Sequence, residues 1–144
     1  MPSTQLVGNY DISQIFLGDN VYEYYTWTNT SGGTLTLKPG TLMGQILSSA
    51  KLLPNLSSST DGTELPMSVL ADTYTVANNG SATVCVCIGG RVNQNALIFG
   101  SGDTLSTAVR TVTTGGGTIH ALINRNTGIL LVPSQELTVQ DPNQ

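Results

Sequence analysis

The sequence predicts a mainly β domain, and three observations support this prediction. The 144-residue chain is rich in Thr, Ser, Gly, Asn and Val, which strands and turns favour. Only 10% of its residues are charged, so the usual formers of exposed helices are scarce. The length fits one domain with its own core. We therefore expect a compact β-sandwich or barrel-like domain, with one or two short helices after residue 103 and an extended N-terminal arm.

We expect the chain to divide into an arm at residues 1–20, a single β-rich domain at 21–137 and a polar tail at 138–144. Six of the eight aromatic residues lie in the first 27 positions. The apolar residues of the arm follow neither the period of a strand nor that of a helix. Such a segment either packs on the domain or awaits a partner, and the sequence leaves both interpretations open.

Short apolar runs separated by Gly, Asn and Pro predict five strands in the first two thirds of the chain. They span residues 21–28, 34–37, 41–47, 67–76 and 82–88. Gly44 interrupts the third run, which indicates a bulge or a close approach of another backbone. Residues 48–60 are Ser-rich and are expected to be exposed. The fifth strand is apolar on both faces, as in a central strand, and is expected to end at Gly89-Gly90.

Beyond Gly102 the apolar spacing becomes helical. Asp103 or Thr104 is placed to cap a first short helix. Its apolar face would consist of Leu105, Ala108, Val109 and Val112. After a flexible break at residues 115–117, residues 119–123 predict a second helix with Gly128 as its C-cap. The alternative pairs residues 118–124 with 129–132 as a hairpin.

Charge and hydropathy exclude several partners. Five basic and nine acidic residues give a net charge of −4, which provides no basic patch for nucleic acid. No apolar run approaches the roughly 20 residues of a membrane span, and residues 1–5 do not resemble a signal peptide. We expect synthesis in the cytoplasm. Cys85 and Cys87 would then lie reduced on one face of the fifth strand, as small buried hydrophobic residues.

We expect no enzymatic activity, no cofactor and no metal site. His120 is the only histidine, and Gly100-Ser101-Gly102 lacks the spacing of a nucleophile elbow. Residues 115–117 are not followed by the Lys-Ser/Thr of a phosphate-binding loop. Four aromatic residues either stack on sugars or bases or belong to a core or interface. They are Tyr22, Tyr24, Tyr25 and Trp27.

The order of turn motifs between residues 34 and 100 resembles the head decoration proteins of tailed bacteriophages, the lambda decoration protein family. The run Lys38-Pro39-Gly40-Thr41 leads to Gly44, and Asp61-Gly62 precedes Pro66 and an apolar strand. A β-run then ends in Gly90-Arg91-Val92 and is followed by Asn95-Ala96-Leu97. Each motif alone is a turn between strands, and the similarity lies in the order in which the motifs follow one another.

This resemblance implies a structural virion protein. It would bind the outside of the phage capsid as a homotrimer at three-fold positions, contact the major capsid protein and stabilise the expanded shell against internal DNA pressure. It would be made in the host cytoplasm and reside on the capsid exterior. The arm would add a strand to capsid elements through its apolar residues. The candidate capsid-binding residues are Leu6, Val7, Tyr10, Ile12, Ile15 and Phe16.

Two other functions fit an all-β chain of this size. A carbohydrate- or receptor-binding module on a virion surface would use the aromatic strand around Trp27 as its binding face. A small trimeric β-enzyme acting on nucleotides would need an Asp that activates water and a phosphate-contacting Ser/Arg motif. The sequence shows neither motif.

Overall fold

The computed structural model describes residues 15–109 and 117–133 of the chain. Strands predominate in these residues. In chain order they are β1 (Phe16–Thr28), β2 (Leu35–Leu37), β3 (Leu42–Gln45), β4 (Leu52–Pro54), β5 (Ser68–Leu70), β6 (Tyr74–Val76), β7 (Ser81–Asn93), β8 (Ala108–Val109), β9 (Gly117–Thr118) and β10 (Gly128–Val132). A 3-10 helix, η1 (Gln94–Ala96), follows β7, and the α-helix α2 (Ile119–Asn126) precedes β10.

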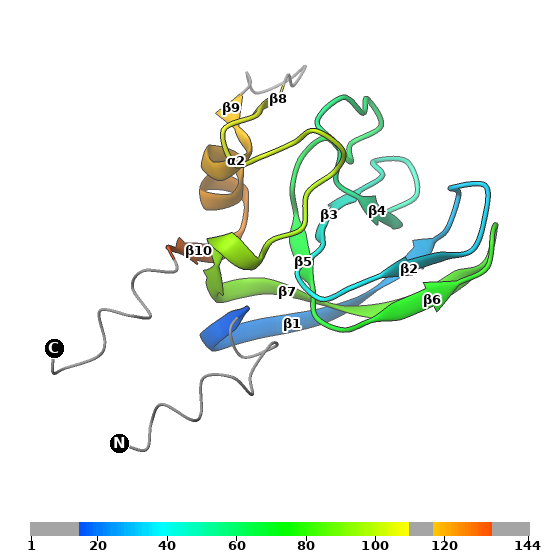
Figure 1. Ribbon diagram of the computed structural model, residues 1–144, viewed down its shortest axis with the longest axis horizontal. Helices are drawn as coiled ribbons and strands as arrows, with labels where there is room; N and C mark the ends of the chain where they lie inside the picture. Colours follow the sequence, from blue (N-terminus) through cyan, green and yellow to red (C-terminus); the bar gives the residue numbers. More distant parts are fainter. Residues whose placement is uncertain (1–14, 110–116, 134–144) are drawn as a thin grey trace, which may run out of the picture.

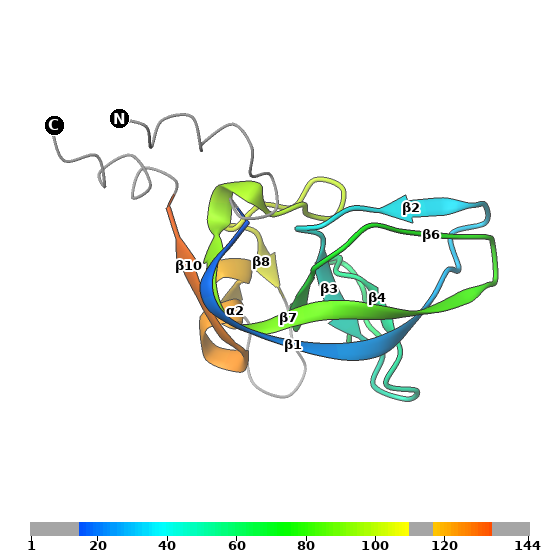
Figure 2. The same ribbon diagram turned by 90° about the horizontal axis from the view of Figure 1, so that it is seen from below.

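Five of the strands close into a small barrel. The large sheet runs in the order β1-β4-β3-β5-β7, and β1 also pairs with β7, so that the sheet returns on itself. β10 extends the sheet by pairing in parallel with the last part of β7. β2 and β6 form a separate two-stranded ribbon at one side of the barrel (Figures 1 and 2). The prediction of a mainly β, barrel-like domain with a short helix is confirmed.

The longest pairing, between β1 and β7, begins earlier in the chain than predicted. β1 starts at Phe16, which pairs with Val92, so residues 16–20 belong to the domain and not to a free arm. Register shifts between Phe16 and Tyr22 break the alternation of side chains. Gly18 and Asp19 have positive φ values of 144° and 54° there. A search for period-two alternation therefore misses this part of the strand.

The sequence predicts that the fifth strand ends at Gly89-Gly90, but β7 continues through Gly90. This glycine instead allows β1 to approach closely. Its φ is +95°, and an added Cβ would lie 2.5 Å from the Cα of Asn20. The Asn20 side chain bridges the two strands, since its Nδ2 donates to the carbonyl oxygens of Gly89 (3.4 Å) and Arg91 (3.0 Å). Gly90 thus lets β7 continue past the bulged part of β1 to Asn93.

Two segments in the middle of the chain differ from the predicted elements. Residues 52–54, expected to be exposed, form β4, and Leu52 is fully buried where it pairs with Trp27. Residues 67–76 form two short strands, because β5 pairs within the barrel and β6 pairs with β2. The close approach predicted at Gly44 is confirmed: an added Cβ would lie 2.5 Å from the carbonyl oxygen of Thr63.

The first predicted C-terminal helix is wrong, and the second is confirmed. Residues 108–109 form β8, which pairs with β9, and Val112 lies outside the described residues. Asp103 caps no helix; its carboxylate accepts from the backbone N and the Oγ of Ser57 (2.9 and 2.6 Å). The parallel pairing of β10 with β7 requires a crossover, which α2 contributes to, so the hairpin alternative is wrong.

α2 is capped by threonines at both ends. At its start the Oγ1 of Thr118 accepts from the backbone N of Ala121 (3.1 Å). At its end Thr127, and not the predicted Gly128, is the cap residue, and its Oγ1 donates to the carbonyl oxygen of Ile123 (2.7 Å). Gly128 is instead the first residue of β10.

The core lies on both faces of the barrel wall, because successive residues of a strand point to opposite faces. One cluster fills the barrel: Trp27, Leu37, Met43, Leu52, Leu70, Val76, Val84 and Val86. The other lies outside the wall against α2 and β10: Ile15, Phe16, Leu42, Val69, Cys87, Val92, Leu97, Val109, Ile119, Leu122, Ile123, Ile129 and Leu131. Through this second cluster, the start of β1 and the end of β10 pack against one common core.

Candidate interaction surfaces

The candidate capsid-binding residues fall into two groups. Ile15 and Phe16 are 8% and 9% exposed and belong to the outer core cluster. The Ile15 carbonyl also accepts from the backbone N of Asn93 (2.8 Å). These two side chains therefore pack on the domain itself, which is one of the two interpretations that the sequence leaves open. The other four candidates, Leu6, Val7, Tyr10 and Ile12, lie outside the described residues.

The two ends of the described chain lie at the same end of the molecule. Val92 of β7 pairs with Phe16 on one side and with Leu131 on the other. β1 therefore starts, and β10 finishes, on either edge of the same strand (Figure 2). Ile15 and Phe16 anchor the point from which residues 1–14 continue. Any partner that binds the arm would accordingly be brought to this end of the barrel.

The aromatic residues of β1 do not form one binding face. Tyr22 and Tyr24 are 43% and 69% exposed on the face that carries Cys87 and Cys85. Trp27 lies on the opposite face and is fully buried in the barrel. It is therefore not available to stack on a sugar, as the glycan-binding alternative requires.

Tyr25 and Tyr24 of β1 have polar neighbours. The Tyr25 hydroxyl donates to Glu23 (2.9 Å), and this hydrogen bond raises the pKa of the phenol. The pKa of Tyr24 is also raised, through its interaction with Cys85. Both groups stay neutral at physiological pH, so β1 gains no charge from them.

The two thiols lie in different environments. Both cysteines are free, and they share a strand face as predicted, opposite Tyr22 and Tyr24. Cys87 is fully buried, and its Sγ donates to the carbonyl oxygen of Gly89 (3.0 Å). Burial raises the pKa of the Cys87 thiol. Cys85 is only half-buried.

We expect the two thiols to differ in reactivity by at least about tenfold at neutral pH, because the thiolate is the reactive form and a buried, raised-pKa thiol rarely ionises. Iodoacetamide labelling of the native protein, followed by peptide mass spectrometry, should modify Cys85 first. Cys87 should react only after denaturant is added. Equal rates in the native protein would contradict the central position of β7.

Within residues 15–109 and 117–133, no three His, Cys, Asp or Glu side chains are grouped to hold a metal ion. His120 lies on α2 with its Nδ1 3.4 Å from the Nδ2 of Asn124. No helix in the described part of the chain is long and apolar enough to cross a bilayer.

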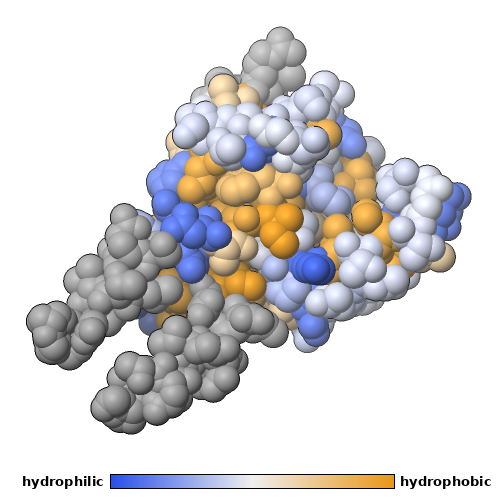
Figure 3. Space-filling model, viewed as in Figure 1, coloured by the Kyte–Doolittle hydropathy of each residue, from blue (hydrophilic) through white to orange (hydrophobic). Residues whose placement is uncertain are grey.

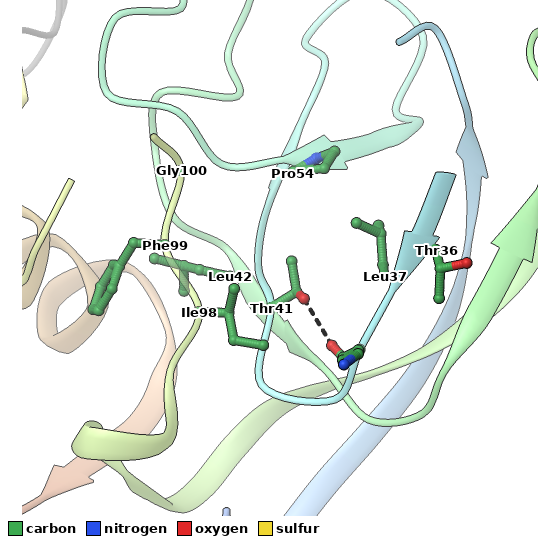
Figure 4. A pocket seen from close by; sticks show the side chains of 9 residues that line it. Thr36, Leu37, Thr41, Leu42, Pro54, Ile98, Phe99 and Gly100 are labelled. Carbon is green, nitrogen blue, oxygen red and sulfur yellow. Dashed lines mark hydrogen bonds between the residues drawn. The ribbon is translucent and has the colours of Figure 1, made fainter. Parts of the chain in front are cut away.

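An apolar pocket of about 250 Å³ opens between β2, β3 and the segment after η1 (Figure 4). Apolar residues gather near the centre of this face of the molecule (Figure 3). The lining residues are Thr36, Leu37, Lys38, Thr41, Leu42, Pro54, Ile98, Phe99 and Gly100. They come from three separate parts of the chain, so no local sequence signal marks the pocket.

Backbone hydrogen bonds hold the pocket walls together. Ile98 donates to the carbonyl of Gly40 (2.9 Å), and its own carbonyl accepts from the backbone N of Leu42 (3.0 Å). The Thr41 hydroxyl donates to the carbonyl of Lys38 (2.7 Å), drawn as the dashed line in Figure 4. Ile98 stays 43% exposed although it belongs to this framework. The pocket is thus a preformed apolar surface with a cationic residue, Lys38, in its lining.

These features define a β-barrel domain whose described residues present candidate interaction surfaces. Residues 17–121, more than two thirds of the chain, match the family of the bacteriophage lambda head decoration protein D. The chain belongs to this family, which confirms the resemblance seen in the sequence. No curated protein matches the chain. Membership makes it a phage head decoration protein, a structural component of the virion capsid.

Proposed function

We propose that this protein binds the outside of the phage capsid as a homotrimer at three-fold positions and stabilises the expanded shell against internal DNA pressure. The family match over residues 17–121 carries the proposal. The major capsid protein is the partner, the role involves neither catalysis nor nucleic acid, and the protein joins the capsid exterior after synthesis in the host cytoplasm.

The apolar arm residues Leu6, Val7, Tyr10 and Ile12 are the capsid contacts in this proposal. The structure supports it through the anchor, since Ile15 and Phe16 fix the start of the arm to the barrel. Ordering an arm residue costs about 1–2 kcal/mol, whereas a strand hydrogen bond returns net about 0.5–1.5 kcal/mol. Burial of the apolar side chains on the capsid, at about 25 cal/mol per Å², must supply the surplus.

Trimer formation would make such marginal arms effective. Three arms on one body bind with an avidity about 10²–10⁴ times that of a single arm, without any new kind of contact. Few charges and an exposed Leu130 and Val21 leave apolar surface for a symmetric interface. The weakness of one arm thus favours an oligomer that presents several arms together.

Cryo-electron microscopy of undecorated expanded heads, mixed with the purified protein, tests this function directly. We expect density for three copies at each three-fold position, and decorated heads that retain DNA on heating or osmotic shock better than bare heads. Sedimentation equilibrium of the free protein should give the mass of a trimer. Monomers at micromolar concentration, or heads without added density, would contradict the proposal.

A further inference from the structure

Leu47 is the most exposed large apolar side chain in the described part of the chain, at 81%. It lies in the turn between β3 and β4. Backbone hydrogen bonds hold this turn, from the N of Ile46 to the carbonyl of Lys51 (2.8 Å) and from the N of Ala50 to the carbonyl of Ile46 (2.9 Å). The backbone N of Leu47 also donates to the carbonyl oxygen of Asp61 (2.9 Å). An ordered turn therefore presents an apolar side chain to solvent.

Gly62 supports the Leu47 side chain from below. A Cβ built on Gly62 would lie 2.7 Å from the Cγ of Leu47, and the φ of Gly62 is +110°. Glycine accepts both this conformation and this close approach without strain. Because the turn is hydrogen-bonded and the side chain already rests on the backbone, docking of Leu47 on a partner would cost little conformational entropy.

The apolar pocket lined by Leu37, Leu42 and Ile98 has the size to receive a leucine side chain. An enclosed cavity of about 150 Å³ accommodates benzene, so the volume of about 250 Å³ suffices for one branched aliphatic side chain. Because Ile98 keeps 43% of its surface exposed, an occupant would bury further apolar area there.

Leu47 is too far from the pocket of its own chain to fill it. Leu42, which lines the pocket, is the first residue of β3, whereas Leu47 follows the end of that strand. Five residues of extended strand separate the two by about 16 Å. A second copy of the chain can bring its own Leu47 to this pocket.

One anion and one cation accompany Leu47. The exposed Asp61 carboxylate accepts from the backbone N (3.0 Å) and the Oγ1 (2.6 Å) of Thr63. These hydrogen bonds lower the pKa of the carboxyl group, which is therefore ionised at neutral pH. Lys51 is exposed at the end of the same turn.

The pocket is accompanied by the same two kinds of charge. Lys38 is exposed in its lining. Gly100 also lines it, and a Cβ built on Gly100 would lie 3.4 Å from a carboxylate oxygen of Asp103. Neither Lys38 nor Lys51 has a carboxylate partner among the described residues. An apolar side chain beside an anion and a cation thus matches an apolar pocket beside a cation and an anion.

We propose that Leu47 of one copy docks in the apolar pocket of the next copy, with Asp61 of the first beside Lys38 of the second. Two different surfaces meet, so the contact is head-to-tail, and repetition of such a contact gives a closed ring or an open filament. Closure after three copies rests on the homotrimer of the proposed function. The contact itself rests on the turn, the pocket and their charges.

Sedimentation velocity of the full-length protein over a range of concentrations tests the apolar part of the contact. We expect Leu47→Asp to raise the concentration of half-maximal assembly by at least about tenfold, because docking would bury an unpaired charge. Tyr24→Asp is the matched control: Tyr24 is 69% exposed on β1, outside the turn and the pocket, and its substitution should leave assembly unchanged. Circular dichroism and the melting temperature verify the fold of both variants.

Substitution of Lys38 tests the charged part of the contact. Lys38→Glu should raise the concentration of half-maximal assembly by about twofold to fivefold, as expected for an exposed ion pair that is replaced by a repulsion. Lys38→Arg keeps the charge and should assemble like the native protein. High salt should remove the difference between the two variants, because it screens exposed charges.

Mixed cysteine variants test which surfaces meet. In a Cys85→Ser background, Leu47→Cys chains are mixed with Ile98→Cys chains and oxidised. We expect a disulfide-linked dimer in the mixture and none with either variant alone. A mixture of Tyr24→Cys and Ile98→Cys chains is the control and should remain unlinked on a non-reducing gel. The remaining thiol, Cys87, is fully buried.

The outcomes separate this contact from the proposed trimer. A trimer that persists in Leu47→Asp, or the lack of a disulfide in the mixture, would overturn the contact and leave the homotrimer intact. Native filaments that Leu47→Asp abolishes would support the contact and overturn the trimer. Disulfides in Leu47→Cys alone would indicate a symmetric contact and exclude docking in the pocket. Native assembly by Lys38→Glu would exclude the pairing of Lys38 with Asp61.

Discussion

Removing residues 1–14 is expected to change the free energy of unfolding by no more than about 1 kcal/mol, since every core residue in the described part of the chain is kept. Removing residues 1–16 should instead lower it by at least about 5 kcal/mol, because Ile15 and Phe16 are buried and large core side chains each contribute about 2–5 kcal/mol. Domains of this size are stable by only about 5–15 kcal/mol, so the longer truncation approaches complete unfolding. Urea unfolding monitored by circular dichroism measures both values.

The shorter truncation also separates folding from capsid attachment. If the arm is the capsid contact, the variant that lacks residues 1–14 should stay folded but bind expanded heads about 10²–10⁴ times more weakly, since all three arms are lost together. Co-sedimentation with undecorated heads gives the affinity. Undiminished attachment would show that the arm is not the contact. Unfolding of the shorter truncation would place residues 1–14 in the core.

The difference between these truncations depends on a strand boundary that the sequence does not predict. The lack of a period predicts an apolar arm, and it places the end of that arm at residue 20. Gly18 and Asp19, at positive φ, and the bulges around Val21 break the alternation by which a strand is recognised. Burial of Phe16 depends on Val92 and Leu131, which lie far along the chain. Strand existence could be predicted, whereas a bulged strand end could not.

The sequence also does not predict which strands pair with one another. The apolar run at residues 67–76 was recognised, yet its two halves pair with different sheets. The apolar pocket combines Leu37, Pro54 and Ile98, whose proximity results from the barrel closure alone. In contrast, Gly44 and the helix at residues 119–126 were predictable, because a close approach and a helical face are local properties. The family came from the order of turns, which is also local information.

Substitution of Trp27 is the second change that should have a large effect on stability. It is fully buried inside the barrel, and its pairing with Leu52 is the register contact that joins β1 to β4. The ring therefore packs at the seam where the sheet closes. Truncation of a buried Trp typically costs about 3–5 kcal/mol, since it leaves a cavity in addition to the lost apolar burial.

We therefore expect Trp27→Ala to lower the free energy of unfolding by about 3–5 kcal/mol, with Tyr24→Ala, 69% exposed on the same strand, changing it by less than about 1 kcal/mol. Trp27→Phe should cost less than the alanine variant, because it keeps an aromatic ring and removes an indole Nε1–H that has no acceptor in the described residues. Urea unfolding followed by circular dichroism suits all three variants, as Trp27 is the only tryptophan. A stable Trp27→Ala protein that has lost binding to a glycan array would instead favour an exposed Trp27 and the carbohydrate-binding alternative.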